Sequence, residues 1–210
     1  MNNNKKGNKH LLMTDLKKEN LKHSTWGQKR EWAHEGLSEA RHFIYLAAGI
    51  FFVGILTGAF YPERFGVVYE TVAETLRYRF EDKGILLTIV LLFFQNATVA
   101  FASILLGLLL GLVPIFSAAA NGVVVGVLLS VAARSSQLYE LWMLLPHGIF
   151  ELPAIFTAWG LGIWHGTWIF RRDKEETLGN RRRKAFLVLF LYILPLLVIA
   201  AIIEGLLAKV

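Results

Sequence analysis

The fold is decided by a run of fifty residues without a charged side chain, GILLTIVLLFFQNATVAFASILLGLLLGLVPIFSAAANGVVVGVLLSVAA (residues 84–133). A membrane-spanning helix needs roughly 20 apolar residues, because the helix rises about 1.5 Å per residue across a hydrocarbon core of about 30 Å. The run is too long for one crossing and too short for three. Pro114 suits the first turn of a helix, so we expect a break near residues 112–116 and two spans, at 84–112 and 114–133.

The composition extends this conclusion to most of the chain. The protein has 210 residues, of which 55% are hydrophobic, and its mean hydropathy is +0.48. These values predict an all-α polytopic membrane protein, with further spans at residues 43–60, 141–170 and 185–207. The chain has no cysteine, which excludes disulfides and thiolate metal sites. The first 42 residues show no apolar core of a cleavable signal peptide, so we expect the spans themselves to direct insertion.

The distribution of basic residues predicts the topology. Residues 1–42 contain nine Lys or Arg against five Asp or Glu, and residues 171–184 contain seven against three. Basic loops stay on the cytoplasmic side, so an even number of crossings must separate these two segments. We therefore expect five spans, with the N-terminus in the cytoplasm and the C-terminus outside. The chain divides into a basic cytoplasmic segment (1–42) and a transmembrane domain (43–210).

Two segments outside the spans are predicted to be helical. Residues 28–42 form a candidate helix at the membrane surface, where their basic surroundings attract anionic lipid head groups. Nucleic-acid binding is not expected, since the charge is modest and mixed. Residues 63–83 carry apolar side chains at helical spacing and predict an amphipathic outer helix that packs on the end of the protein. Its apolar positions are Phe65, Val68, Val72, Leu76 and Phe80.

The fourth span contains the most unusual stretch, LPHGIFELP (residues 145–153). On a helix that begins near Pro146, His147 and Glu151 lie four residues apart on one face. Proline interrupts helical hydrogen bonding, so Pro146 and Pro153 predict that this helix is broken near Pro146. Ionisable groups in lipid are costly and usually face a protein interior or a water-filled cavity.

Other polar residues are expected near that stretch within the bilayer. The predicted intramembrane polar site consists of His147, Glu151, Glu204, Asn96 and Asn121. One interpretation is that these groups hold helices together by hydrogen bonds. A second is a pathway for ions, protons or a solute, as in transporters with broken helices. A third is binding of zinc or another cation, although one imidazole without cysteine is a thin ligand set.

Small residues recur at helical spacing in several spans. Such rows let helix backbones approach closely in lipid, so they predict a compact bundle, with a homodimer where one row is left unpaired. The predicted packing residues are Gly107, Gly111, Gly122, Gly126, Ala154, Ala158, Gly162 and Gly166.

The stretch LLPHGIFELPA (residues 144–154) resembles the signature of the stage II sporulation protein M family. Asn96, Asn121-Gly122 and Ile203-Glu204 also resemble that family's pattern, and the likeness covers residues 43–208. The resemblance implies an integral protein of the cytoplasmic membrane of a bacterium or archaeon. In spore formers, the family member anchors a wall-remodelling complex with extracytoplasmic partners.

These observations give two functional hypotheses. The first is a non-enzymatic scaffold or anchor for a cell-envelope complex, in contact with the bilayer and with extracytoplasmic proteins. The alternative is a small transporter or channel that uses the His/Glu/Asn site. No nucleophile constellation or zinc-protease motif is present, and no cofactor is expected apart from the cation considered above.

Overall fold

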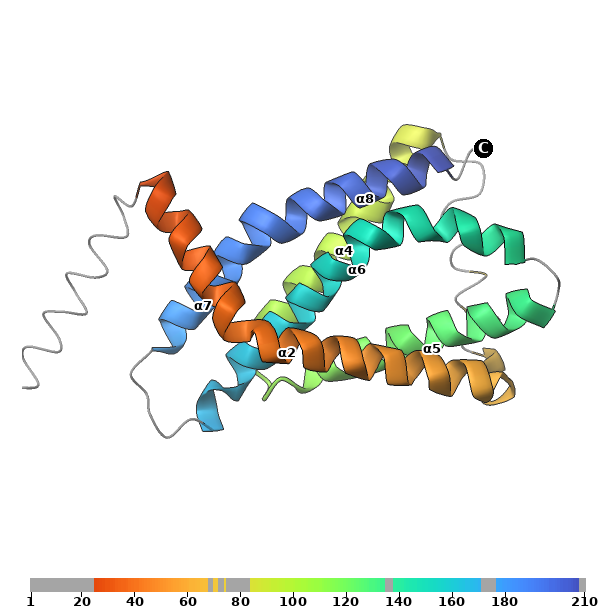
Figure 1. Cartoon of the computed structure of the whole chain (residues 1–210), viewed down its shortest axis with the longest axis horizontal. Coiled ribbons are helices and arrows are strands. Elements are labelled where there is room, and N and C mark those ends of the chain that lie inside the picture. Colours follow the sequence, from red (N-terminus) through yellow and green to blue (C-terminus); the bar gives the residue numbers. More distant parts are fainter. Residues whose placement is uncertain are drawn as a thin grey trace, which may run out of the picture.

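A computed structural model describes residues 25–67, 70–71, 74, 84–134, 138–170 and 177–207, and within 138–147 it describes the backbone alone. Every regular element among these residues is helical, which confirms the predicted all-α class. The long elements are shown in Figure 1 and are α2 (Trp26–Phe60), α4 (Ile85–Leu106), α5 (Leu112–Arg134), α6 (Leu138–Gly166), α7 (Leu178–Val188) and α8 (Leu194–Leu207).

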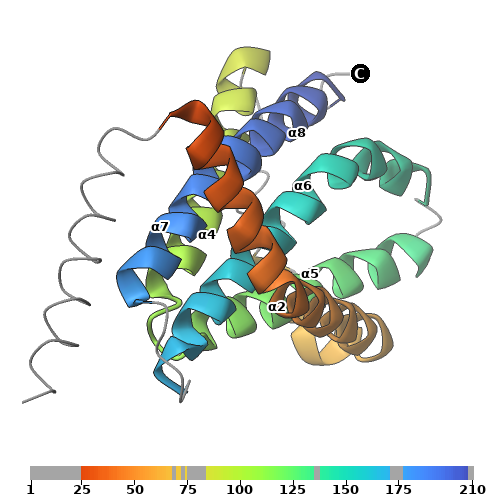
Figure 2. The ribbon, with the colours of Figure 1, turned by 60° about the vertical axis from the view of Figure 1, so that its left-hand side comes forward.

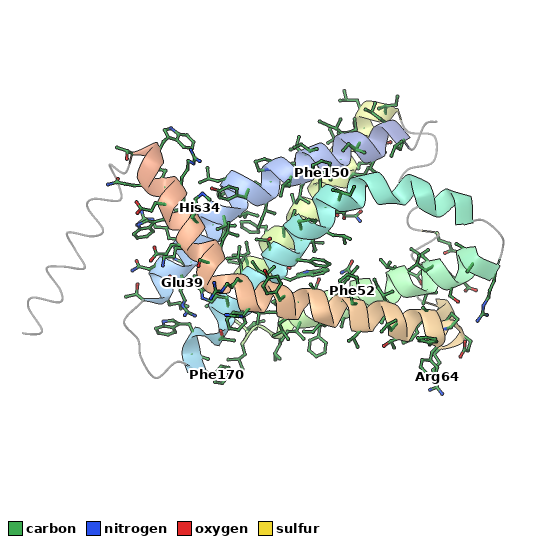
Figure 3. All side chains as sticks on the ribbon, in the orientation of Figure 1. His34, Glu39, Phe52, Arg64, Phe150 and Phe170 are labelled. Atoms are coloured by element: carbon green, nitrogen blue, oxygen red, sulfur yellow. The ribbon has the colours of Figure 1, made fainter. Side chains whose placement is uncertain are left out.

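Four helical rods in the described part are long and apolar enough to cross a membrane. They are α2, α4, α5 and the continuous rod of residues 178–207 formed by α7 and α8. The 29-residue helix α6 packs among them. Large apolar side chains such as Phe52 remain exposed around the bundle, as Figure 3 shows, and this is the surface expected of a protein in contact with lipid. The number of crossings and the sides on which the termini lie remain predictions.

Helix α2 is one continuous element of 35 residues. The helix predicted at 28–42 is present, but it continues without interruption into the first span instead of ending before it. Its position at the membrane surface stays a prediction. At its start, the Thr25 backbone N–H donates to Gln28 Oε1 over 3.0 Å, which satisfies one amide that the helix leaves free. Figures 1 and 2 show that α2 bends along its length, so its first half crosses α7 while its second half runs beside α5.

The break between α4 and α5 comes earlier than predicted. Residues 107–111 form the turn, and α5 begins at Leu112, so Pro114 lies inside its first turn rather than opening it. Leu110 (φ 58°) and Gly111 (φ 73°) both adopt positive φ, a conformation that suits glycine and reverses the chain sharply. The turn contains only glycine and leucine, so a prediction based on the position of proline could not locate it.

Helix α6 is unbroken between Leu138 and Gly166. The predicted break near Pro146 is therefore wrong, and Pro146 and Pro153 are both accommodated inside the helix. Figure 1 shows α6 curving over its first half, and a bend is the usual response of a helix to internal proline.

The last rod begins at Leu178, seven residues before the predicted start at 185. Leu189–Ile193 form a π turn, called η3, in which the Leu194 N–H donates to the carbonyl of Leu189. Pro195 follows immediately and has no N–H to give to the preceding turn, so the chain accommodates Pro195 through this π turn.

The outer segment after α2 is described only at its beginning. Pro62–Phe65 form a short 3-10 helix, η1. Most of the predicted amphipathic helix at 63–83 lies outside the described residues.

Candidate functional site

The eight predicted packing residues are all buried, and several lie where two helices meet backbone to backbone. A Cβ atom on Gly58 would come within 2.9 Å of the Val127 amide nitrogen, and one on Gly122 would come within 3.1 Å of the Gly54 Cα. On α6, a Cβ atom on Gly162 would meet the backbone of Ser103 and the ring of Pro114, and one on Gly166 would meet the backbone of Gly107 and Gly111 in the α4–α5 turn. Ala154 and Ala158 are fully buried. These rows hold α2 on α5, and α6 on the turn, at the closest separation that a helix pair allows.

The helices held in this way bring three of the five predicted polar residues together. The side-chain amide of Asn96, on α4, is hydrogen-bonded to the carboxyl group of Glu151, on α6. Glu204, on α8, is close enough to Glu151 for the two carboxyl groups to interact electrostatically. Both glutamates are half-buried. We call Asn96, Glu151 and Glu204 the acidic cluster; it joins the three helices α4, α6 and α8.

The remaining two predicted residues are not seen in that cluster. Asn121 is exposed on α5, and its Nδ2 donates to the Ser117 carbonyl over 2.8 Å within the same helix. The neighbouring Ser117 hydroxyl accepts a bond of 3.1 Å from Trp159 Nε1 on α6. The side chain of His147 lies outside the described part of the chain.

Metal binding is not supported by the residues that the structure describes. Among them, no three His, Asp or Glu side chains are grouped so that they could hold a metal ion. Within the cluster, Glu151 and Glu204 supply carboxylate oxygens and Asn96 supplies an amide. Either carboxylate can bind a proton on its own, whereas a hard cation would need further oxygen ligands. The suggested cation site depended on His147, so it stays a prediction.

A second polar region was not predicted from the sequence. At the opposite end of the bundle, Arg181 of α7 is 2% exposed and donates to the Trp164 carbonyl over 2.9 Å, with its guanidinium 4.7 Å from the Trp164 ring. The next residue of α6, His165, is 1% exposed and places Nδ1 3.4 Å from the Ile104 carbonyl. Both side chains therefore meet carbonyls in the last turns of α6 and α4, where helix carbonyls need partners from outside the regular helical pattern. The Trp164 carbonyl also accepts from Thr167 Oγ1 over 3.0 Å.

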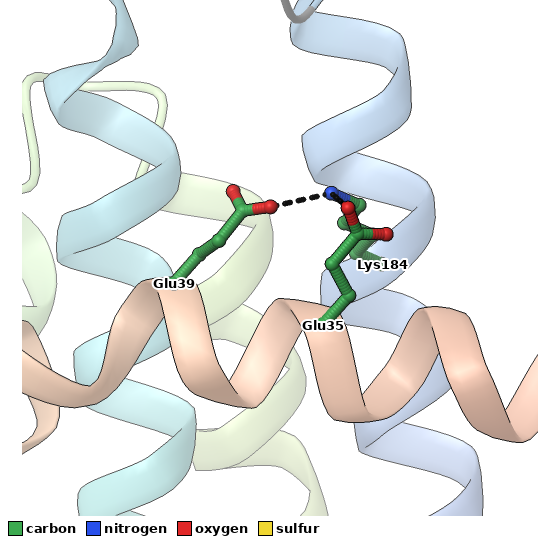
Figure 4. Close-up of polar contacts among 3 residues, drawn as sticks. All are labelled: Glu35, Glu39 and Lys184. Carbon is green, nitrogen blue, oxygen red and sulfur yellow. Dashed lines mark hydrogen bonds and ion pairs between the residues drawn. The ribbon is translucent and has the colours of Figure 1, made fainter.

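Lys184 completes this second region. Its ammonium is 2.7 Å from Glu39 Oε1 and 3.3 Å from Glu35 Oε1, and Figure 4 shows both carboxylates reaching it from α2. Lys184 is 5% exposed, so the two carboxylates compensate a charge that has lost most of its water. The spacings Glu35–Glu39 and Arg181–Lys184 place each pair on one face of a helix, and they could have indicated an acidic face that meets a basic one. This signal was missed because residues 178–184 were assigned to a loop.

The apolar rods and the small-residue rows that pack them together define a polytopic helical membrane protein. A family model described as stage II sporulation protein M matches residues 47–209. The chain therefore belongs to the stage II sporulation protein M family, as its LPHGIFELP stretch indicated. Searches of curated proteins and of solved structures found no match.

Proposed function

We propose that this protein is a non-enzymatic membrane scaffold that anchors a cell-envelope complex in the cytoplasmic membrane of a bacterium or archaeon. The observation that carries the proposal is the backbone-level packing of the bundle at Gly54, Gly58, Gly122 and Gly126. Such packing resists the sliding and rocking of helices on which transport cycles depend. A rigid bundle suits a protein that presents a fixed surface to partners.

The surface proposed for extracytoplasmic partners is the outer connection that follows α2. It begins with the 3-10 helix η1, where Glu63 and Arg64 are exposed. The test is affinity purification of the full chain from its native membranes, followed by identification of proteins that co-purify. Scrambling residues 66–83 should remove the partner, whereas exchanging exposed apolar residues of α2 such as Phe52 for leucine should not. Recovery of the same partners by the scrambled chain would contradict this surface.

The acidic cluster favours a second function, a small transporter or channel. Two carboxyl groups and an amide meeting between three spans are a common feature of ion and proton pathways. The variant Glu151→Gln separates the two functions, because it keeps a hydrogen-bonding group for Asn96 but removes the ability to ionise. For a scaffold, Glu151→Gln should recover the same partners as the wild-type chain.

Transport is measured on the same variant in proteoliposomes. A transporter should show proton or cation flux that Glu151→Gln abolishes. If wild-type proteoliposomes show flux and Glu151→Gln does not, while partner recovery is absent in both, the scaffold proposal is wrong. If no flux is detected and partners co-purify with both chains, transport is excluded for the ions tested.

A further inference from the structure

The first half of α2 carries its charges in two separate stripes. Arg30, His34 and Arg41 follow one another at intervals of four and seven residues, so they lie along one side of the helix. Glu31, Glu35 and Glu39 follow at intervals of four, along a neighbouring side. We call residues 26–42 the arm. The family match begins at residue 47, so both stripes precede the matched part.

Two contacts with the last rod fix the way in which the arm is turned. Glu35 and Glu39, from the acidic stripe, bind Lys184. His34, from the basic stripe, lies on Tyr192, with Nε2 3.0 Å from the hydroxyl and ring centroids 5.6 Å apart. A Cβ on Gly36 would sit 3.0 Å from the Cβ of Lys184, so the arm lies directly on α7 between these contacts.

The order of these contacts along the last rod indicates which side of the arm is directed towards the membrane. Lys184 and Tyr192 belong to the same continuous rod of residues 178–207. Tyr192 is eight residues further along it, or about 12 Å towards its apolar half. The acidic stripe therefore faces the polar end of the rod, and the basic stripe faces the membrane. Figure 3 shows His34 and Glu39 at different positions on the arm beside α7.

The two arginines of the basic stripe are open to other molecules, whereas His34 is engaged with Tyr192. Arg30 and Arg41 are exposed, and so is Trp26, which is 71% exposed. Trp26 packs against the Lys29 ammonium at 5.6 Å. Tryptophan and basic side chains together favour the head-group region of a bilayer. The acidic groups that would repel anionic lipid are partly neutralised by Lys184.

We propose that Arg30 and Arg41 form a docking surface for the phosphate groups of anionic phospholipids on the side of the membrane where the arm lies. The ion pairs of Lys184 with Glu35 and Glu39 orient that surface. The arm thereby binds the bilayer through its two arginines, while Glu35, Glu39 and His34 hold it on the bundle. This goes beyond the scaffold role, because it concerns lipid recognition by the arm and not the protein partners of the outer connection.

The test uses the full chain in nanodiscs in which phosphatidylcholine is progressively replaced by phosphatidylglycerol. The chain has no native cysteine, so Ser38→Cys, at an exposed position of the arm, carries a single environment-sensitive fluorophore. The wild-type arm should respond at a low fraction of phosphatidylglycerol. Arg30→Gln with Arg41→Gln should raise the midpoint about 30-fold, since each basic residue near an anionic surface contributes about 1 kcal/mol.

The matched control removes two exposed arginines of α7, by Arg182→Gln with Arg183→Gln. This variant should stay within about twofold of wild type, because neither residue belongs to the stripe. Lys184→Met should weaken the response even though it leaves every arginine of the stripe in place. Each variant is first checked for monodispersity and thermal stability; if the double arm variant does not fold, Arg30→Gln and Arg41→Gln are measured singly and should each shift the midpoint about fivefold.

Three results would overturn the proposal. Equal shifts in the arm variant and the α7 variant would show that the attraction is a diffuse charge effect. A wild-type arm that responds equally in pure phosphatidylcholine would show that anionic lipid is not recognised. The same response to inorganic phosphate in phosphatidylcholine nanodiscs would assign the site to a free anion.

Discussion

At the scale of single residues, the closest helix contacts in this bundle require glycine, because a larger side chain does not fit there. Gly58 and Gly49 lie on the same helix, α2, but in opposite surroundings. A Cβ on Gly58 would meet the backbone of Val123 and Val127, whereas a Cβ on Gly49 would meet nothing within 4 Å. A backbone atom cannot move aside as a flexible side chain can, so only a hydrogen atom fits at position 58.

We therefore predict that Gly58→Ala destabilises the protein and Gly49→Ala does not. Overpacking at a closed helix contact costs about 1–3 kcal/mol, while alanine on an exposed helix gains up to about 1 kcal/mol over glycine. The measurement is thermal unfolding of both variants in the same detergent. Equal melting temperatures for the two variants would show that α2 and α5 are not in backbone contact.

The same scale shows what could be predicted from sequence and what could not. The presence of Asn96 and Glu151 inside predicted apolar spans indicated a shared polar site, and the structure joins these two residues and Glu204. Lys184 was missed because its burial depends on where α7 begins. A charged residue in a loop is normally solvated, and only the helix start at Leu178 turns Lys184 towards the arm.

At the scale of helices, the four apolar rods were predictable, because a long apolar run is sufficient to indicate a membrane-spanning helix. Their ends were less predictable, because proline does not have a single effect on a helix. Pro114 lies in the first turn of α5, Pro153 lies inside a continuous α6, and Pro195 follows a π turn. How each proline is accommodated depends on packing against the neighbouring helices, because that packing determines whether the chain reverses, bends or forms a π turn there.

The π turn leads to a prediction about deletion. A π turn holds one residue more than the corresponding α-helical turn, so removing Phe190, which is 60% exposed, should convert η3 to α-helix. The faces of α7 and α8 should keep their orientation. Removing the exposed Val198 from α8 should instead rotate everything beyond it by about 100°, taking Ala201 and Gly205 out of their buried positions.

Thermal unfolding in detergent measures both deletions. The Phe190 deletion should lower the melting temperature much less than the Val198 deletion. A larger loss for the Phe190 deletion would mean that the π turn itself, rather than the register it preserves, is required for packing.

At the scale of the whole molecule, the directions of the helices agree with the charge pattern. Figures 1 and 2 place the end of α2 and the end of α5 on one side of the bundle, and the α4–α5 turn together with the start of α7 on the other. The second side carries the exposed arginines Arg182 and Arg183 and the arm. Basic segments favour the cytoplasm, so we predict that this side is cytoplasmic and that the first is outside.

Because the chain has no native cysteine, single cysteines report the topology directly. Ser38→Cys and Arg183→Cys should react with a membrane-impermeant maleimide only after the cells are permeabilised, whereas Glu63→Cys and Arg134→Cys should react on intact cells. All four positions are exposed, so a failure to react reflects the side of the membrane and not burial. Reaction of Ser38→Cys and Glu63→Cys from the same side would show that α2 does not cross the membrane. Reaction of Arg134→Cys and Arg183→Cys from the same side would show that α6 does not cross the membrane. The chain would then cross an even number of times, and its two termini would lie on the same side.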